Sequence, residues 1–337
     1  MKVLFICPKF FGYEKEISDA LKRKGHEVTY IDEKPSNNVF YKILLRLRKD
    51  SLYIRRSVDS YFKSVLQNSP EDVDMILILK GESLTESIVK NLRKKYSKAK
   101  IVFYAWDSIV NYPQVQNYLY LCDFKFTFDD RDIKNFDGMN HLPLFFSPAF
   151  MDSKIQYNCQ GDFSHKKNKV AFLGSVHSDR YALLGRFYQL HRKTLDCDFV
   201  LYFPSAVVLC GFIFRNFKNI LKYKLLSFSL RPRSKREIAD FFLSADAVLD
   251  IQHPGQSGLT MRTLECIPLQ RKMITTNPEI KNYDFYNESN YFILDRNSLL
   301  MDYSFFRKTF SPTDENIINK YSVDHWVSVL CSPVNQH

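Results

Sequence analysis

Short apolar runs alternate with longer amphipathic stretches along the first half of the chain. The short runs have the length and the β-branched or aromatic content of strands: Val3–Cys7, Glu27–Ile31, Asp74–Leu79, Ile101–Ala105, Phe124–Phe128 and His141–Leu144. Amphipathic stretches over Glu14–Lys24 and Leu84–Tyr96 predict helices between them. Apolar runs separated by helices are typical of a parallel sheet buried on both faces. The pattern predicts one doubly wound α/β domain over residues 1–150.

The polar, irregular segment Met151–Asn168 is interpreted as a linker, after which the strand–helix rhythm restarts. The expected elements are strands at Lys169–Leu173, Asp198–Phe203, Ala247–Ile251 and Lys272–Thr275, and helices at Tyr181–Arg192, Lys235–Ser244 and Leu259–Ile267. Residues 322–331 predict a terminal helix with Ser322 as its cap. Because loops at the carboxyl ends of parallel strands bind ligands, we expect two Rossmann-like domains facing across a cleft, the second over residues 151–321.

The charge balance adds a basic surface to this architecture. Lys and Arg number 48 against 37 Asp and Glu, a net charge of +11, which favours a polyanionic partner. Two basic, aromatic segments stand out, Tyr41–Arg56 and the acid-free Gly211–Arg236. Such segments suit an anionic membrane surface, they suit nucleic acid by the same chemistry, or they are solvated faces of buried helices. All three interpretations are open at this point.

Several features bear on the compartment. The longest apolar candidate, Ala206–Phe214, has nine residues, too few to cross a bilayer, and the apolar run near Met1 is too short for a signal peptide. The seven cysteines are odd in number and widely dispersed, without a CxxC pair, so we expect neither disulfides nor a structural zinc site. These features predict a cytoplasmic protein.

Three enzyme classes lose support from missing motifs. Gly12 is the only glycine of the first loop, so the dinucleotide fingerprint GxGxxG of dehydrogenases is absent. No GxSxG elbow or P-loop occurs, which disfavours hydrolases and NTPases. The eight histidines show no metal-ligand spacing such as HExxH.

The segment Gly255–Glu265 joins a small-residue turn to an apolar helix. Free backbone N–H groups and the positive end of the helix dipole favour an anion there, and Arg262 adds a forked donor to a phosphate. Glu265, one turn further on, suits ribose hydroxyls. The candidate ligand-binding residues in and beside this segment are His253, Ser257, Gly258, Leu259, Thr260, Arg262 and Glu265. The alternative is an ordinary capped helix with Arg and Glu facing solvent.

A second candidate segment, Phe172–Arg180, follows the first strand of the second domain. Gly174 lets the backbone approach a ligand, Ser175 follows it, and Arg180 neutralises negative charge. The alternative is a plain strand–helix turn with surface charges.

The block Val248–Asn277 resembles the donor-binding segment of bacterial GT-B glycosyltransferases of the broad group-1 type, closest to spore-maturation-like and lipopolysaccharide or capsule transferases. Glu265 matches the second glutamate of that family, which binds the nucleotide ribose. The first glutamate, eight residues earlier in retaining members, falls on Ser257 here. This departure leaves open whether the reaction inverts or retains configuration.

The resemblance implies a metal-independent glycosyltransferase without a cofactor. The C-terminal domain would bind a nucleotide sugar, and the N-terminal domain would bind the acceptor, a lipopolysaccharide, O-antigen or capsule glycan on a lipid carrier. It also implies that the terminal segment, residues 322–337, crosses back to the N-terminal domain. The protein would then act at the inner face of the cell membrane, with nucleic acid not expected as a partner. The alternatives are a non-catalytic nucleic-acid or membrane-binding protein and a sugar-nucleotide epimerase.

An inverting enzyme of this type needs a base that deprotonates the acceptor hydroxyl. Asp107 follows the strand Ile101–Ala105 beside Trp106, and Glu82 ends another strand; we favour Asp107. The alternative for Asp107 is a helix cap with Ser108. The acidic residues nearby are interpreted as turn caps rather than metal ligands: Asp129, Asp130 and Asp132.

Overall fold

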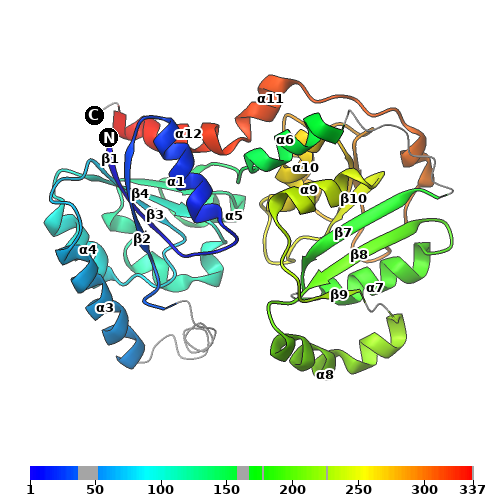
Figure 1. Ribbon diagram of the computed structural model, residues 1–337, viewed down its shortest axis with the longest axis horizontal. Helices are drawn as coiled ribbons and strands as arrows, with labels where there is room; N and C mark the ends of the chain where they lie inside the picture. The colour runs from blue at the N-terminus through cyan, green and yellow to red at the C-terminus, as the bar shows by residue number, and fades with distance from the viewer. Residues whose placement is uncertain (37–51, 158–166, 177, 225–226, 336–337) are drawn as a thin grey trace. The chain divides into compact units, whose positions relative to one another are not determined.

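The computed structural model describes the chain apart from residues 37–51, 158–166, 177, 225–226 and 336–337 (Figure 1). It divides into two compact units. Unit 1 comprises Met1–Leu144 and Val323–His337, and unit 2 comprises Phe145–Ser322. Each unit is an α/β domain built on a parallel six-stranded sheet, so the prediction of two Rossmann-like domains is confirmed.

The sheet of unit 1 has the order β2-β1-β3-β4-β5-β6. Its strands are β1 (Lys2–Cys7), β2 (Glu27–Asp32), β3 (Met75–Leu79), β4 (Lys100–Ala105), β5 (Phe124–Thr127) and β6 (Met139–His141). In the parallel register Ile6 of β1 lies beside Ile31 of β2 and Ile78 of β3. The chain first adds β2 on one side of β1 and then β3 on the other. The carboxyl ends of β1 and β3 therefore mark the switch point at which ligands bind in such sheets.

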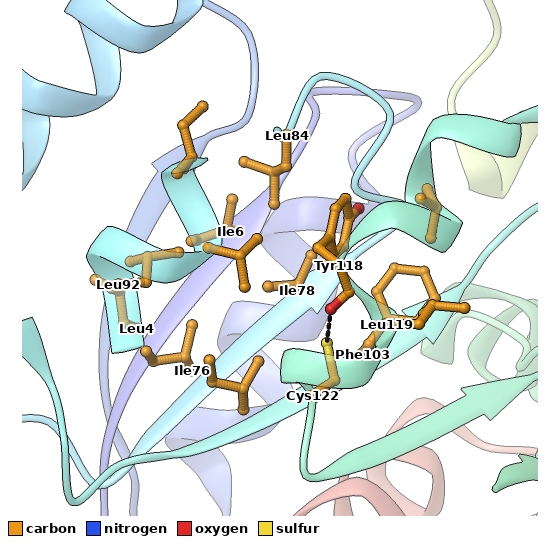
Figure 2. Close-up of a cluster of buried hydrophobic side chains, with 14 of the residues drawn as sticks. Leu4, Ile6, Ile76, Ile78, Leu84, Leu92, Phe103, Tyr118, Leu119 and Cys122 are labelled. Carbon is orange, nitrogen blue, oxygen red and sulfur yellow. Dashed lines mark hydrogen bonds between the residues drawn. The ribbon is translucent and has the colours of Figure 1, made fainter. Parts of the chain in front are cut away.

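Helices cover both faces of this sheet, as its continuously apolar strands require. On one face, α3 (Leu52–Gln67) and α4 (Glu86–Lys95) close over β-strand side chains such as Ile6, Ile78 and Phe103 (Figure 2). Thr85 caps α4 by accepting a hydrogen bond from the Ile88 amide. On the other face lie α1 (Tyr13–Arg23) and α12 (Val323–Asn335), which pack against each other (Figure 1).

The helix α12 belongs to unit 1 although unit 2 precedes it in the chain. Its Trp326 is fully buried, with its ring centroid 4.7 Å from that of Tyr104 on β4. Asp324 pairs with Arg23 of α1 at 2.8 Å. Apolar burial supplies most of the attachment, because an exposed ion pair contributes little. The buried residues of α12 are Val323, Trp326, Val327, Leu330 and Cys331.

The sheet of unit 2 has the order β12-β11-β10-β7-β8-β9. Its strands are β7 (Lys169–Ser175), β8 (Asp196–Tyr202), β9 (Phe228–Ser229), β10 (Ala247–Asp250), β11 (Lys272–Thr275) and β12 (Tyr291–Ile293). Here the order of strands reverses between β7 and β10. We therefore expect a ligand of unit 2 to bind at the edge where these two strands have their carboxyl ends.

The helices of unit 2 form two groups. The helices α6 (Pro148–Tyr157), α9 (Lys235–Leu243) and α10 (Met261–Leu269) pack together, and α7 (Arg180–His191) packs on α8 (Ala206–Tyr223). A Cβ on Gly185 of α7 would lie 2.4 Å from the Tyr223 ring, so only glycine allows this approach. The remaining elements are the short helices α5 (Asp130–Asn135) and α11 (Glu315–Lys320) and the 3-10 turns Ile109–Asn111, Pro113–Asn117, Leu119–Leu121, Pro278–Asn282 and Tyr303–Arg307.

Three boundaries differ from those expected from sequence. Unit 2 begins at Phe145, six residues before the expected start of the second domain at residue 151. The segment expected to be a linker begins as the second half of α6, because Phe150 is buried among the neighbouring helices despite the polar sequence. The last strand of unit 1 is Met139–His141 rather than His141–Leu144; Pro143 lacks the N–H that a longer ladder needs. Among the described residues, no helix is long and apolar enough to span a bilayer.

We expect Trp326→Ala to lower the free energy of unfolding of unit 1 by about 3–5 kcal/mol, because it removes a buried aromatic and leaves a cavity against Tyr104. Urea denaturation measures this loss. Val110→Ala, at a position 64% exposed in the same unit, is the control and should change stability by less than about 0.5 kcal/mol. Equal stability of the Trp326 variant and the control would contradict the role given to α12.

Candidate functional site

The edge of the unit 2 sheet where β7 and β10 end carries Arg180, the first residue of α7. Its guanidinium donates from Nε and Nη2 to the carbonyl oxygen of Ile251 at 3.1 and 2.6 Å, and from Nη1 to the carbonyl oxygen of Ser175 at 2.8 Å. It also lies 5.7 Å from the ring centroid of Phe172. Arg180 therefore joins the end of β7 to the segment that follows β10.

Arg262 and Glu265 lie one turn apart on α10 and pair with each other, with Arg262 Nη1 and Glu265 Oε2 at 2.5 Å. Arg262 Nη2 donates to the Leu173 carbonyl oxygen at 3.2 Å, and its guanidinium stacks 4.3 Å from the Phe242 ring centroid. The two side chains are 19% and 5% exposed. The alternative of a helix with both side chains in solvent therefore does not hold.

A third arginine, Arg296, lies at this edge and was not singled out from the sequence. It follows β12 and donates to the Gln252 carbonyl oxygen at 3.1 Å and to Asp179 at 2.7 Å. A charged pair directly after a strand, Asp295–Arg296, is the signal that could have found it. Its neighbours come from β10 and α7, which are distant in sequence, so spacing alone does not reveal the contact.

The three guanidinium groups influence one another. Burial lowers the pKa of Arg180 to about 10; Asp250 opposes this shift, whereas Arg262 and Arg296 add to it. Mutual repulsion of this kind is relieved when an anion binds among the cations. The amino end of α10 reaches the same edge and adds the positive end of its dipole. This edge of unit 2 is therefore suited to a phosphate-bearing ligand.

The loop before α10 is held in place by a buried carboxylate. Asp250 accepts hydrogen bonds from the hydroxyls of Thr260, Thr263 and Thr275 at 3.0–3.2 Å. Thr260 also caps α10 by accepting from the Thr263 amide. The hydroxyl cluster around the buried Asp250 fixes the start of the helix, and Thr260 satisfies the Thr263 amide of its first turn.

The other donor-side candidates line the same loop. The Ser257 and Gly258 carbonyl oxygens accept from Asn277 Nδ2 at 2.9 and 3.3 Å. Leu259 is 2% exposed, so its side chain belongs to the core and only its backbone is available to a ligand. His253 Nδ1 accepts from the Gly255 amide at 3.0 Å and shapes the turn.

Gly174 and Ser175 form the end of β7. A Cβ on Gly174 would approach Phe172 Cζ to 3.2 Å, so the backbone is closely packed there. Ser175 is bound to Arg180 through its carbonyl oxygen, and Arg262 reaches the carbonyl of Leu173. The structure thus brings both sequence-derived segments, Phe172–Arg180 and Gly255–Glu265, to one edge.

The corresponding edge of unit 1 carries a compact set of charges. Lys80 Nζ lies 3.0 Å from Asp107 Oδ2 and 3.6 Å from Glu82 Oε2, and Lys34 Nζ lies 3.2 Å from Glu82. The Asp107 side chain is 30% exposed, against 12% for Glu82. Burial lowers the pKa of Lys80, but Asp107, Tyr112 and Glu82 raise it by more, so its ammonium group stays charged.

Lys80 holds a left-handed backbone conformation, with φ 72°, and Gly81 follows with φ 66°. A non-glycine residue in this region is strained, and such strain is concentrated at functional sites. A Cβ on Gly81 would lie 2.1 Å from the Tyr118 hydroxyl oxygen, so that position requires glycine. A lysine at this position in the sequence does not indicate a left-handed backbone.

The buried Glu33 organises that loop. Its two carboxylate oxygens accept from the Gly81 and Ser83 amides at 3.0 and 2.9 Å. Burial raises the pKa of Glu33 to about 7, with Glu82 adding to the shift and Lys34 and Lys80 opposing it. Glu33 was also missed from the sequence, where it follows Asp32 as an ordinary acidic loop residue.

The acidic residues after β5 are structural. Asp129 caps α5 by accepting from the Arg131 amide. The buried Asp132 accepts from Thr127 Oγ1 at 2.9 Å and from the Ile109 amide at 3.1 Å. Ser108 donates from its hydroxyl to Asp132, and its side chain does not cap the 3-10 turn that follows. Asp107 pairs with Lys80 instead. Among the described residues, no three His, Cys, Asp or Glu side chains gather as a metal site.

Comparison with known proteins identifies the fold. No family model matches the sequence, and no curated protein matches it. Solved structures do match over the whole chain, and they place it in the GT-B fold class of two Rossmann-like domains.

Three of these structures show the range of that class. A glycosyltransferase from Rickettsia africae ESF-5 matches with a TM-score of 0.63 and 12% identity over 99% of this chain and 98% of that chain. Anabaena Alr3699/HepE in complex with UDP and glucose matches with a TM-score of 0.60 and 10% identity over 100% of both chains. A UDP-GlcNAc 2-epimerase from Neisseria meningitidis bound to UDP-GlcNAc matches with a TM-score of 0.55 and 12% identity, again over 100% of both.

We expect the stability advantage of the wild type over Glu33→Gln to shrink as pH rises from about 4.5 to about 7. A carboxyl whose folded-state pKa is raised binds its proton more tightly when folded, so its contribution to stability is full below the unfolded pKa and is lost as pH rises to the folded pKa. The loss is on the order of 3 kcal/mol for a shift from 4.5 to about 7.

Chemical denaturation of both chains across this pH range measures the change. The control is Glu27→Gln, which removes one exposed carboxylate from the start of β2 in the same unit. A pH-independent difference between wild type and Glu33→Gln would contradict the titration assigned to Glu33.

Proposed function

We propose that the protein is a glycosyltransferase that moves a sugar from a nucleotide-sugar donor to a glycan acceptor. The observation that carries this proposal is the edge of unit 2 where Arg180, Arg262 and Arg296 meet at the start of α10. That edge suits a diphosphate, the part that most nucleotide-sugar donors share. The likeness to HepE, solved with UDP and glucose, supports the same ligand class.

The donor would lie against the two loops that end β7 and β10. Arg262 and Arg296, with the amides of the first turn of α10, would stabilise the negative charge that develops on the departing diphosphate. Glu265 is already oriented by Arg262 and would accept from ribose hydroxyls. Because Arg180 is engaged by two carbonyl oxygens, we assign it to shaping the phosphate loop rather than to direct contact.

In unit 1 we assign the base to Asp107 rather than Glu82. Asp107 is the more exposed of the two, and it has one lysine neighbour where Glu82 has two. Lys80 would hold the Asp107 carboxylate in place for the acceptor hydroxyl. This assignment applies to an inverting reaction, since a retaining one needs no such base.

The acceptor we propose is a lipopolysaccharide, O-antigen or capsule glycan on a lipid carrier. The net charge of +11 supports an anionic membrane surface as a partner, with the protein at its cytoplasmic face. No divalent metal or cofactor enters the proposed reaction, since arginines and a helix dipole supply the positive charge. Of nucleic acid and membrane, we favour the membrane.

A sugar-nucleotide epimerase is the second candidate, supported by the likeness to the Neisseria meningitidis enzyme bound to UDP-GlcNAc. It would use the same nucleotide edge without an acceptor. Incubation with a panel of nucleotide sugars, with and without glycan acceptors, separates the two. Conversion of the donor sugar without an acceptor favours the epimerase, whereas release of nucleotide only with an acceptor favours transfer.

For the donor edge, we expect Arg262→Ala and Arg296→Ala each to weaken binding of a nucleoside diphosphate by roughly 10–100-fold, the loss of a hydrogen bond to a charged group. Isothermal calorimetry with uridine, guanosine, adenosine and cytidine diphosphates measures the effect. The control is Arg307→Ala, which removes an exposed arginine of unit 2 away from this edge. Wild-type affinity in both test variants would rule out the donor edge.

For catalysis, we expect Asp107→Asn to lower turnover by roughly 10²–10⁴-fold while nucleotide affinity stays near that of the wild type, because the amide cannot accept the acceptor proton. Glu82→Gln is the matched comparison and should lower turnover less. NMR analysis of the product anomer establishes whether configuration is inverted. Near-normal turnover of Asp107→Asn with an inverted product would show that another group is the base.

A further inference from the structure

The helix α8 carries apolar side chains on two faces, and one face packs against unit 2. Leu209, Phe212 and Ile220 contact the hydrophobic core of the unit, and Tyr223 is buried against Gly185 of α7. An amphipathic helix on the surface of a globular domain packs an apolar face of this kind against the core. This inward face accounts for the attachment of α8 and leaves its other apolar side chains unexplained.

The second apolar face points away from the core. The exposed apolar residues follow one another at intervals of three and four, on both sides of a kink at Asn216: Val207, Cys210, Phe214, Phe217 and Leu221. Phe214 is 86% exposed, Val207 82%, and Phe217 and Leu221 nearly 60%. Cys210, Ile213, Phe214 and Phe217 line an open apolar hollow on this face. Contiguous exposure of this kind marks an interaction surface.

A basic stripe runs beside this apolar face. Arg215, Lys218 and Lys222 are all exposed and again lie three and four residues apart. The sequence from Ala206 to Arg236 contains eight Lys or Arg and no Asp or Glu. An apolar stripe beside Lys and Arg is the pattern of a helix that lies in the plane of a membrane interface, with the basic groups among anionic headgroups.

We propose that α8 binds an anionic membrane surface lying flat, with Val207, Cys210, Phe214, Phe217 and Leu221 inserted among the lipids and Arg215, Lys218 and Lys222 at the headgroups. The proposal takes the membrane partner from the proposed function and names the surface that binds it. The kink at Asn216 divides the 18 residues of α8 into two helical segments, and both carry exposed apolar side chains. The helix is not apolar enough to cross the bilayer.

Charge favours an anionic membrane over a second copy of the chain as the partner of α8. The three- and four-residue spacing would also suit a helix–helix seam. Two copies of α8 would, however, bring two acid-free basic stripes together, and like charges at such a seam are repulsive. An anionic lipid surface supplies the opposite charge instead.

The test is sedimentation of the full chain with vesicles of phosphatidylcholine alone or mixed with phosphatidylglycerol. We expect binding to the mixed vesicles that weakens as salt rises. Phe214→Gln with Phe217→Gln should weaken it by at least tenfold. Arg215→Gln, Lys218→Gln and Lys222→Gln should each weaken it by about fivefold. The control, Leu300→Gln, removes a side chain 67% exposed elsewhere on unit 2 and should bind like the wild type.

A second readout reports on insertion itself. An environment-sensitive fluorophore on the exposed Cys210, in a chain carrying Cys159→Ser, should shift to the blue when anionic vesicles are added. Nucleoside diphosphate affinity of the Phe214→Gln and Phe217→Gln chain should match the wild type, so that loss of membrane binding is separable from loss of the donor site.

Three results would overturn the proposal. The first is equal binding to both vesicle types at all salt concentrations. The second is a dimer that dissociates in the double-phenylalanine variant without any vesicle binding. The third is binding to single-stranded nucleic acid in place of vesicles.

Discussion

The reversal of strand order between β7 and β10 determines where every candidate donor residue can lie. A parallel sheet puts the carboxyl ends of all its strands at one edge. Where the strand order reverses, the chain leaves the two neighbouring strands toward opposite faces of the sheet, so a crevice opens between their loops. Arg180, Arg262 and Arg296 come from three segments that are distant in sequence and meet at that one place. Unit 1 repeats the arrangement between β1 and β3, where Lys80 and Glu33 lie.

Backbone carbonyl groups hold the arginines of the donor edge. Leu173, Ile251 and Gln252 each accept from a different guanidinium at the ends of β7 and β10. A carbonyl is a partial charge, so it orients a guanidinium without neutralising it as a carboxylate would. Arg296 keeps only a half-exposed partner in Asp179, whereas Arg262 is balanced by Glu265. The side chains of the edge are therefore already ordered, which reduces the entropy lost on binding.

Much of this arrangement is readable from sequence, and the parts that are not share a cause. Buried strands such as Met75–Leu79 are continuously apolar, and the loop before α10 combines small residues with Arg262, so both could be predicted. The helix α6 was missed because its burial depends on α9 and α10 rather than on its own pattern. Arg296 and Glu33 were missed because their partners are distant in sequence. The left-handed backbone conformation of Lys80 was missed because a lysine in the sequence does not indicate a positive φ.

The chain leaves unit 1 at Leu144 and returns to it at Val323, so unit 2 is inserted between two parts of one core. During synthesis the face of the unit 1 sheet that carries Tyr104 is made long before the helix that covers it. A domain folds as a unit once its own sequence has emerged, and unit 2 is continuous. Unit 2 can therefore complete its fold on the ribosome while unit 1 still exposes an apolar surface. The core of unit 1 is therefore complete only after α12 has been made, and until then part of its sheet face stays uncovered.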